Sequence, residues 1–166
     1  MVSCDNFDKG YHGVFLTTSC TYLKLLGIDT DSCQPYVSYY GTVPSYSSLT
    51  QCRDGSTYRK YKAKNFYYLL TINQINTILF NYGSVEVWFT VYNDFMNYQS
   101  GVYKRQSNSR IGEHYVKIDG WSVENGVEHW IIANSLGSFR AEGEFFRITF
   151  GECGIEELVI TVDPSL

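Results

Sequence analysis

Two side chains in the second half of the chain, His114 and Asn134, are of types that work together in nucleophilic catalysis. When a cysteine thiol attacks an acyl group, an imidazole takes up the thiol proton and later protonates the leaving group. A third polar side chain orients the imidazole, and an asparagine amide can fill this role. A thiol could come from one of five cysteines, which are Cys4, Cys20, Cys33, Cys52 and Cys153.

A β-hairpin is expected to bring His114 and Asn134 close together. Residues 114–123 and 128–135 are rich in β-forming residues, and they flank the sequence Glu-Asn-Gly, in which Asn-Gly is a strong turn signal. His114 begins the first strand and Asn134 lies near the end of the second, so antiparallel pairing would let the amide reach the ring. The competing interpretation is a hydrogen-bonded pair that only packs the hairpin.

The remaining elements follow from apolar spacing and capping residues. A buried helix is expected over 15–28, and a second helix is expected from Thr71, in a capping-box pattern with Gln74, to Gly83. One or two helical turns are expected over 93–99. Further strands are expected over 84–91, 145–150 and 158–162. Because helices come early and strands late, the predicted fold class is α+β.

Residues 29–64 predict a long irregular loop. A loop of this length is unusual in a compact domain unless something holds it, and a disulfide between Cys33 and Cys52 would do so. The histidines His12 and His129 are expected to have structural or surface roles. Glu113 could form an ion pair with His114, whereas the adjacent carboxylates of Glu156 and Glu157 are expected at a solvated edge.

The composition excludes several classes of function. The chain has 166 residues, the size of one domain, with 17% aromatic residues, only three prolines and a formal net charge of −4. There is no basic stripe for nucleic acid, no long apolar run for a membrane, and no Cys/His spacing for zinc. We therefore expect no metal or other cofactor. A chain starting at Met1 would lack a signal peptide and stay in the cytosol.

Several blocks of the sequence resemble the papain-like cysteine peptidases, nearest to the cathepsin B group. The most specific blocks are 84–95 (SVEVWFTVYNDF), 120–126 (GWSVENG) and 130–135 (WIIANS), supported by 33–36 (CQPY) and 153–156 (CGIE). The chain is similar to the C-terminal two-thirds of such a peptidase. The resemblance implies a helical domain, here a remnant over 1–64 with a disulfide-pinned loop, and an antiparallel β-barrel domain over 65–166. It also implies that His114 is the catalytic imidazole and Asn134 its orienting partner.

The resemblance also implies that the nucleophile is absent. In the family the nucleophilic cysteine and the glutamine of the oxyanion hole lie upstream of the first residue of this chain. None of the five cysteines has surroundings like those of the nucleophile. Cys20 is expected to be a core residue, Cys153 a cysteine without a nucleophilic role, and Cys4 a free thiol because Ser48 replaces its partner. Cys33–Cys52 is the family disulfide that we expect to remain.

Positions along the substrate-facing cleft of the family also differ. Tyr11 replaces a bridging cysteine, Val14 follows Gly13 in place of a second glycine, and Leu136 replaces a tryptophan that covers the His–Asn pair. Glu113 introduces a charge and Tyr115 a large ring beside the histidine. Leu158 takes the place of the acidic residue in the cathepsin B specificity pocket. These cleft positions are Gly13, Val14, Glu113, Tyr115, Leu136 and Leu158. The loop between Cys33 and Cys52 is expected to be too short for an occluding loop.

Three hypotheses remain open. The first is a cysteine peptidase homologue that does not hydrolyse peptides as this chain, either because an upstream segment is missing or, as we favour, because catalytic selection was lost. The second is a non-catalytic protein that binds a peptide or a partner protein in the former cleft. The third is a chain that does not fold stably. Family members are lysosomal or secreted, so the compartment stays open, as does the oligomeric state.

Overall fold

The computed structural model describes residues 15–35, 51–134 and 142–165. The chain divides into two compact units, Met1–Phe66 with Val162–Leu166, and Tyr67–Thr161. His114 and Asn134 both belong to the second unit. The boundary of a helical domain at residue 64 remains a prediction. Tyr11, His12, Gly13, Val14, Ser48, Leu136 and Cys4 lie outside the described residues.

In the first unit, helix α1 (Leu16–Leu25) confirms the helix expected from the apolar spacing. Its buried side chains are Leu16, Ser19, Cys20 and Tyr22. The chain leaves the helix through Gly27, whose φ of 73° is costly for a residue with a side chain. A Cβ atom there would also lie 2.7 Å from the carbonyl oxygen of Tyr61, so the close approach of the two segments requires glycine.

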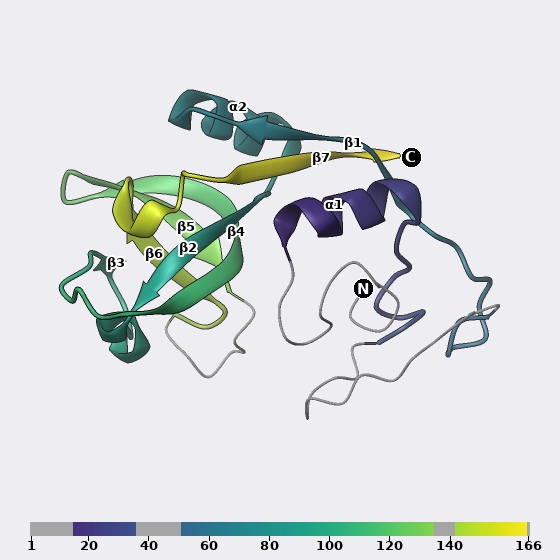
Figure 1. Ribbon diagram of the computed structural model, residues 1–166, viewed down its shortest axis with the longest axis horizontal. Coiled ribbons are helices and arrows are strands. Elements are labelled where there is room, and N and C mark those ends of the chain that lie inside the picture. The colour runs from purple at the N-terminus through teal and green to yellow at the C-terminus, as the bar shows by residue number, and fades with distance from the viewer. Residues whose placement is uncertain (1–14, 36–50, 135–141, 166) are drawn as a thin grey trace. The chain divides into compact units, whose positions relative to one another are not determined.

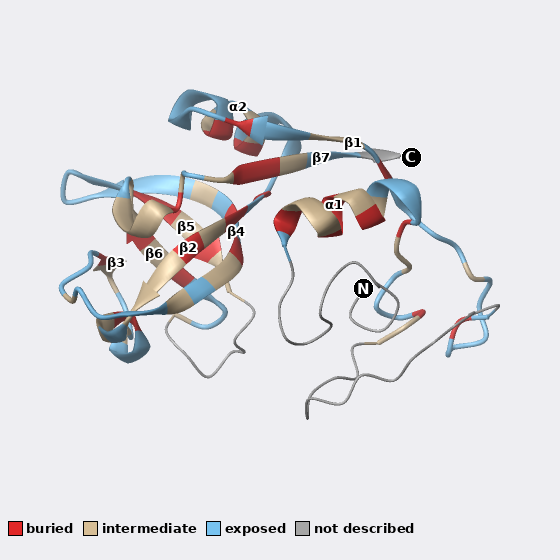
Figure 2. Cartoon of the chain, in the orientation of Figure 1, coloured by how far each residue is buried: buried red, intermediate tan, exposed pale blue. Residues whose placement is uncertain are grey.

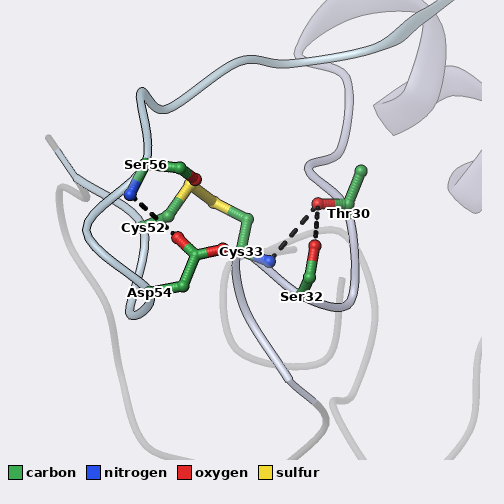
Figure 3. Close-up of a disulfide and its surroundings, with 6 residues drawn as sticks. All are labelled: Thr30, Ser32, Cys33, Cys52, Asp54 and Ser56. Carbon is green, nitrogen blue, oxygen red and sulfur yellow. Dashed lines mark hydrogen bonds between the residues drawn. A yellow bond between two sulfur atoms is a disulfide. The ribbon is translucent and has the colours of Figure 1, made fainter.

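The predicted Cys33–Cys52 disulfide is present, and it joins two short turns of the first unit (Figure 3). On one side, the backbone N–H of Cys33 donates to Thr30 Oγ1 at 3.3 Å. On the other, Asp54 Oδ1 accepts a hydrogen bond of 2.9 Å from the backbone N–H of Ser56. This carboxylate therefore stabilises a local turn of the Asx type. The disulfide and these side-chain hydrogen bonds hold the two turns, which contain no helix among residues 29–35 and 51–58.

A seven-stranded sheet has the order β1-β7-β2-β4-β5-β6-β3 among the described residues. Four of its strands, β2, β4, β5 and β6, pair antiparallel and curve strongly (Figure 1), whereas β3 pairs parallel with β6. Strands β1 and β7 each run from one unit into the other. The bounds are β1 Lys62–Leu69, β2 Val85–Tyr92, β3 Val102–Tyr103, β4 Arg110–Glu124, β5 Val127–Ala133, β6 Phe145–Thr149 and β7 Val159–Ser165. With helices α1 and α2, the fold is α+β.

Helix α2 (Ile72–Tyr82) begins at the predicted capping residue. The side chain of Thr71 accepts a hydrogen bond from Gln74 N at 3.2 Å, and Gln74 Oε1 accepts one from Leu70 N at 2.8 Å. This arrangement differs slightly from the usual capping box, in which the second bond goes to the N-cap residue itself. Ile75 and Leu79, one turn apart, are the buried residues of the helix. Figure 2 shows its remaining surface as mostly exposed.

The hairpin of β4 and β5 has the two-residue turn that Asn-Gly predicted. Asn125 and Gly126 have φ angles of 51° and 79°, as the tight turns of β-hairpins require. The register then shifts within β4, because Gly120 pairs with Ile131 whereas Ile118 pairs with Ile132. Asp119 is the extra residue between these pairs, so it forms a β-bulge. The bulge interrupts the alternation of inward and outward side chains, so residues before Asp119 point to the opposite face from the one that an uninterrupted strand would give them.

The core of the second unit lies inside the curved sheet, where β2, β4, β5 and β6 carry buried side chains (Figure 2). Many of these side chains are aromatic. Phe89, Phe95 and Phe146 contact one another with ring centroids 4.9–5.3 Å apart, and Trp130 stacks on Phe150 at 4.1 Å. The high aromatic content of the sequence is thus used, at least in this cluster, to fill the core.

Candidate functional site

The side chains of His114 and Asn134 are hydrogen bonded, with 2.9 Å between His114 Nε2 and Asn134 Oδ1. An amide oxygen can only accept, so Nε2 carries the proton in this bond. In the neutral ring the lone pair therefore lies on Nδ1, and this is the atom that can act as a base. No further hydrogen bond of the His114 ring is found within the described part of the chain. The asparagine thus fixes both the tautomer and the orientation of the imidazole.

The bulge at Asp119 places the two side chains on the same face of the hairpin. Beyond the bulge Lys117 pairs with Ala133, and one further step would put Asn134 opposite Val116. His114 lies two residues from Val116 and shares its face, so His114 and Asn134 form a diagonal pair. If the same sequence continued the register of Gly120 and Ile131 without a bulge, Asn134 would lie opposite Lys117, whose side chain points to the other face.

Both partners are also held by their neighbours. The backbone N–H of Asn134 donates a 2.7 Å hydrogen bond to the carbonyl oxygen of Glu144, just after the end of β5. On β2, Phe89 pairs with His114 across the sheet. The two rings meet edge to face, with centroids 6.1 Å apart, and Phe89 is fully buried. The imidazole therefore packs against the buried aromatic core through Phe89, which restricts its position.

A pocket of about 230 Å³ opens beside the pair. Its walls come from β2, from the 3₁₀ helix η2 (Asn93–Asn97) that follows it, from β4 and from β6. Most of the lining is apolar or aromatic. The lining residues are Val91, Phe95, Met96, Tyr98, Ile111, Gly112, Glu113, His114, Asn134 and Phe146. Sequence reasoning missed the apolar walls, because residues of this type on strands are indistinguishable from core residues until the fold brings them together.

Of the predicted cleft residues, Glu113 lines this pocket beside His114. The possible ion pair of Glu113 with His114 is not found among the described residues, and Glu113 Oε1 pairs with Arg110 Nη2 at 2.5 Å. Tyr115 lies across from Trp88 and points to the opposite face of β4 from His114. Leu158 is half-buried and does not line this pocket. The roles of Tyr115 and Leu158 in a substrate cleft remain predictions.

The described cysteines are poorly suited to attack a substrate. Cys33 and Cys52 are joined in the disulfide, and the Cys20 side chain in α1 is completely buried. Cys153 is a half-buried free thiol. Burial, followed by the charge of Glu152, raises the pKa of Cys153 to about 11. Because the thiolate is the nucleophilic form, Cys153 is almost entirely unreactive thiol at neutral pH.

The carboxylate of Glu156 is a structural acceptor and does not lie at a solvated edge as expected. It accepts a 2.6 Å hydrogen bond from the indole Nε1 of Trp130, and a 2.8 Å bond from the backbone N–H of Gly151. A buried tryptophan needs such an acceptor for its indole nitrogen. His129 is also buried and donates from Nδ1 to the carbonyl oxygen of Val127 at 3.1 Å, which fits a structural role.

Two kinds of feature are not found among residues 15–35, 51–134 and 142–165. No group of three or more histidine, cysteine or acidic side chains there is arranged to hold a metal ion. No described helix has the length and apolar character needed to cross a bilayer.

Comparisons with known proteins identify the family of the chain. The model of the papain family of cysteine proteases matches residues 1–162. Cathepsin B-like CP3 of Giardia intestinalis is 40% identical over 169 residues, which cover 96% of this chain and 55% of that protein. Cathepsin B-like protease 1 of Arabidopsis thaliana is 33% identical, over 94% of this chain and 45% of its own length. The chain spans about half the length of these relatives.

A solved structure supports the same assignment at the level of the fold. ProCathepsin B S9 from Trypanosoma congolense superposes with a TM-score of 0.89 at 28% identity, covering 99% of this chain and 59% of that one. The fold, the sequence relatives and the family match all indicate the same family. The chain belongs to the papain family of cysteine proteases, in its cathepsin B-like group.

Proposed function

We propose that these 166 residues carry the imidazole half of a cysteine-peptidase site and do not hydrolyse peptides by themselves. The observation that carries the first part is the hydrogen bond from His114 Nε2 to Asn134 Oδ1, which leaves Nδ1 as the basic atom. The second part is supported by the described cysteines, which are bridged, fully buried or held as a neutral thiol.

The chemistry available to His114 requires a thiol next to Nδ1. The thiol proton would pass to Nδ1, which gives a thiolate and an imidazolium, and the amide oxygen of Asn134 would stabilise the imidazolium through the Nε2 proton. After the thiolate has attacked the peptide carbonyl, the same proton would pass from Nδ1 to the leaving amine. Without the thiol, the imidazole has no nucleophile to activate, and loss of one such group costs several orders of magnitude in rate.

The first test is an assay of the 166-residue chain on a fluorogenic peptide amide. We expect release of the fluorophore at the rate of the buffer blank, and the same rate for the variant His114→Ala. Hydrolysis above the blank that disappears in His114→Ala would show that a thiol within these residues completes the site. Circular dichroism of both proteins with heating checks that they are folded, and a cooperative transition contradicts the hypothesis of an unstable chain.

A second candidate function is the binding of a peptide without cleavage, and the pocket beside His114 favours it. At about 230 Å³ the pocket is smaller than the roughly 300–1,000 Å³ typical of small-molecule sites, so it suits a single side chain. Its mostly apolar walls favour a side chain with an aliphatic stem. Isothermal titration with an unlabelled alanine-based peptide that carries one norleucine is the test. Saturable binding without cleavage is the expected result, and absence of binding at millimolar peptide would exclude this function.

A further inference from the structure

We infer that the ion pair between Glu142 and Arg147 positions Asn134, and through Asn134 the imidazole of His114. Neither member of the pair lines the pocket, so both act through other residues and are positioning residues. For catalysis this rests on the proposed function, because only an imidazole that exchanges a proton with a thiol needs its ring held in one tautomer.

Asn134 is anchored at the end of a strand, beyond the regular pairs of the ladder. The ladder between β5 and β6 ends with the pair Ala133 and Phe145. Just beyond it, the backbone N–H of Asn134 donates to the carbonyl oxygen of Glu144 at 2.7 Å. Bonds at the frayed end of an element open more easily than those in its middle. The placement of the Asn134 amide therefore depends on what keeps the carbonyl group of Glu144 in place.

The carbonyl group of Glu144 belongs to a tight turn from Glu142 to Phe145. The backbone N–H of Glu142 donates to the carbonyl oxygen of Phe145 at 3.3 Å, and the two residues form an isolated β-bridge. Gly143 within the turn has a φ of 76°, which favours glycine. Because the backbone bond is longer than the usual N–H···O range, it closes the turn only weakly. A further restraint is needed to hold the turn.

The side chain of Glu142 supplies this restraint by tying the turn to β6. Arg147 Nε donates to Glu142 Oε2 at 2.9 Å, and Arg147 Nη2 donates to Oε1 at 2.6 Å. Such a two-bond pair fixes the relative orientation of its members, and this one is partly buried, with side-chain exposures of 24% and 28%. Arg147 is itself fixed within the sheet, since it pairs with Ile131 of β5 and with Val102 of β3.

The same ion pair also holds a wall of the pocket. Glu142 Oε1 accepts a 3.2 Å hydrogen bond from the backbone N–H of Gly101, whose carbonyl oxygen accepts from the Tyr98 hydroxyl at 2.6 Å. The Tyr98 hydroxyl in turn accepts from the backbone N–H of Arg147 at 3.3 Å. Tyr98 lines the pocket beside His114. The ion pair thus connects the anchor of the asparagine with the opposite side of the site.

The test measures the tautomer of the His114 ring in the 166-residue chain, from the ¹⁵N NMR shifts of Nδ1 and Nε2 at mildly alkaline pH. In Glu142→Ala the Asn134 amide should be held less firmly. The ratio of the Nε2–H to the Nδ1–H tautomer should then fall by about twofold to tenfold, the factor that corresponds to one hydrogen bond. Glu142→Gln keeps one oxygen for Arg147, so the fall should be smaller. Glu124→Gln removes another carboxylate partner of Arg147 and should leave the ratio unchanged.

Two further variants separate positioning from a general loss of stability. Glu156→Ala should destabilise the fold through Trp130 without changing the tautomer ratio. In an Asn134→Ala background, Glu142→Ala should have no further effect on the ring, because its effect passes through the amide.

An unchanged ratio in folded Glu142→Ala, an equal fall in Glu156→Ala, or a further fall in the double variant would overturn the inference. If Glu142→Ala does not fold, the same criteria apply to Glu142→Gln. The ring is observed without a substrate, so the result does not depend on the peptide assay. Cleavage of the fluorogenic peptide by the chain would overturn the proposed function and leave the positioning role intact.

Discussion

His114 and Asn134 meet as a diagonal pair across β4 and β5, with 2.9 Å between Nε2 of the ring and Oδ1 of the amide. The pairing of the two strands brings the side chains close together. The amide makes the only hydrogen bond to the His114 ring within the described residues. Replacement of Asn134 by alanine should leave the imidazole in place on Phe89 but without an acceptor for its Nε2 proton.

We expect Asn134→Ala to lower the free energy of unfolding by about 0.5–1.5 kcal/mol, the usual net contribution of one hydrogen bond. The Nε2 proton of His114 should also exchange faster with water, which long-range ¹⁵N–¹H NMR of the labelled ring measures. Asn108→Ala, at an exposed position, is the matched control. An unchanged exchange rate in Asn134→Ala would show that the amide does not protect this proton.

Glu156 should be far more sensitive to substitution than its neighbour Glu157. Glu156→Ala removes the acceptor of both Trp130 Nε1 and Gly151 N, so a buried indole N–H is left unsatisfied. The expected loss is about 1–3 kcal/mol, and Glu156→Gln, which keeps one carbonyl oxygen, should lose less. Urea unfolding followed by tryptophan fluorescence measures the difference. Equal losses for Glu156→Ala and Glu157→Ala would contradict the structural role.

Stability in acid should depend on Glu142. Hydrogen bonds from the Arg147 guanidinium are the main cause that lowers the pKa of Glu142 from its usual value of 4.5. A carboxyl whose folded-state pKa is depressed stabilises the fold above its unfolded-state pKa. That stability is lost as the pH falls from about 4.5 through the lower folded-state pKa.

Glu142→Gln should therefore make the free energy of unfolding less dependent on pH below about 4.5. Urea titrations at several pH values between neutral and strongly acidic provide the measurement. Glu144→Gln, at an exposed position two residues away, is the control and should keep the acid dependence of the parent chain. The same acid dependence in Glu142→Gln and the parent chain would remove Glu142 from this role.

Cys153 should resist alkylation in the native chain. Because burial raises the pKa of its thiol to about 11, very little thiolate is present near pH 7.5. Iodoacetamide at that pH should leave Cys153 and the fully buried Cys20 unmodified, as peptide mapping by mass spectrometry would show. Both should react once the chain is unfolded in guanidinium chloride. Rapid alkylation of native Cys153 would contradict the assignment of this thiol as unreactive.

Local signals in the sequence were sufficient to predict the helices and the hairpin. Thr71 and Gln74 marked the start of α2, and Asn125 with Gly126 marked the hairpin turn, because these residues act on the backbone next to them. Strand β1 was missed, since only Ala63 and Leu69 are buried in it and no alternation results. The bulge at Asp119 was missed as well, because it arises from how β4 and β5 pair and no residue type at this position indicates it.

The candidate site was predictable only in part. The proximity of His114 and Asn134 followed from the hairpin, and the family resemblance implied the same pair. The pocket could not be predicted, because its walls are contributed by segments from Val91 to Phe146 that meet only in the folded sheet. The solvated position expected for Glu156 was wrong, since its carboxylate accepts hydrogen bonds from Trp130 and Gly151, which the local sequence does not single out.

The β-bulge at Asp119 sets the register of β4 against β5 around His114, and this register limits which changes in sequence preserve the site. Substitutions along the strand alter one side chain each, but a shift of the register between β4 and β5 by one residue would exchange the inner and outer faces of every shifted residue. The His–Asn pair thus depends on the register of the hairpin as much as on the identity of its two members. Substitutions could therefore change the lining of the pocket around His114 repeatedly while the register of the hairpin kept the pair together.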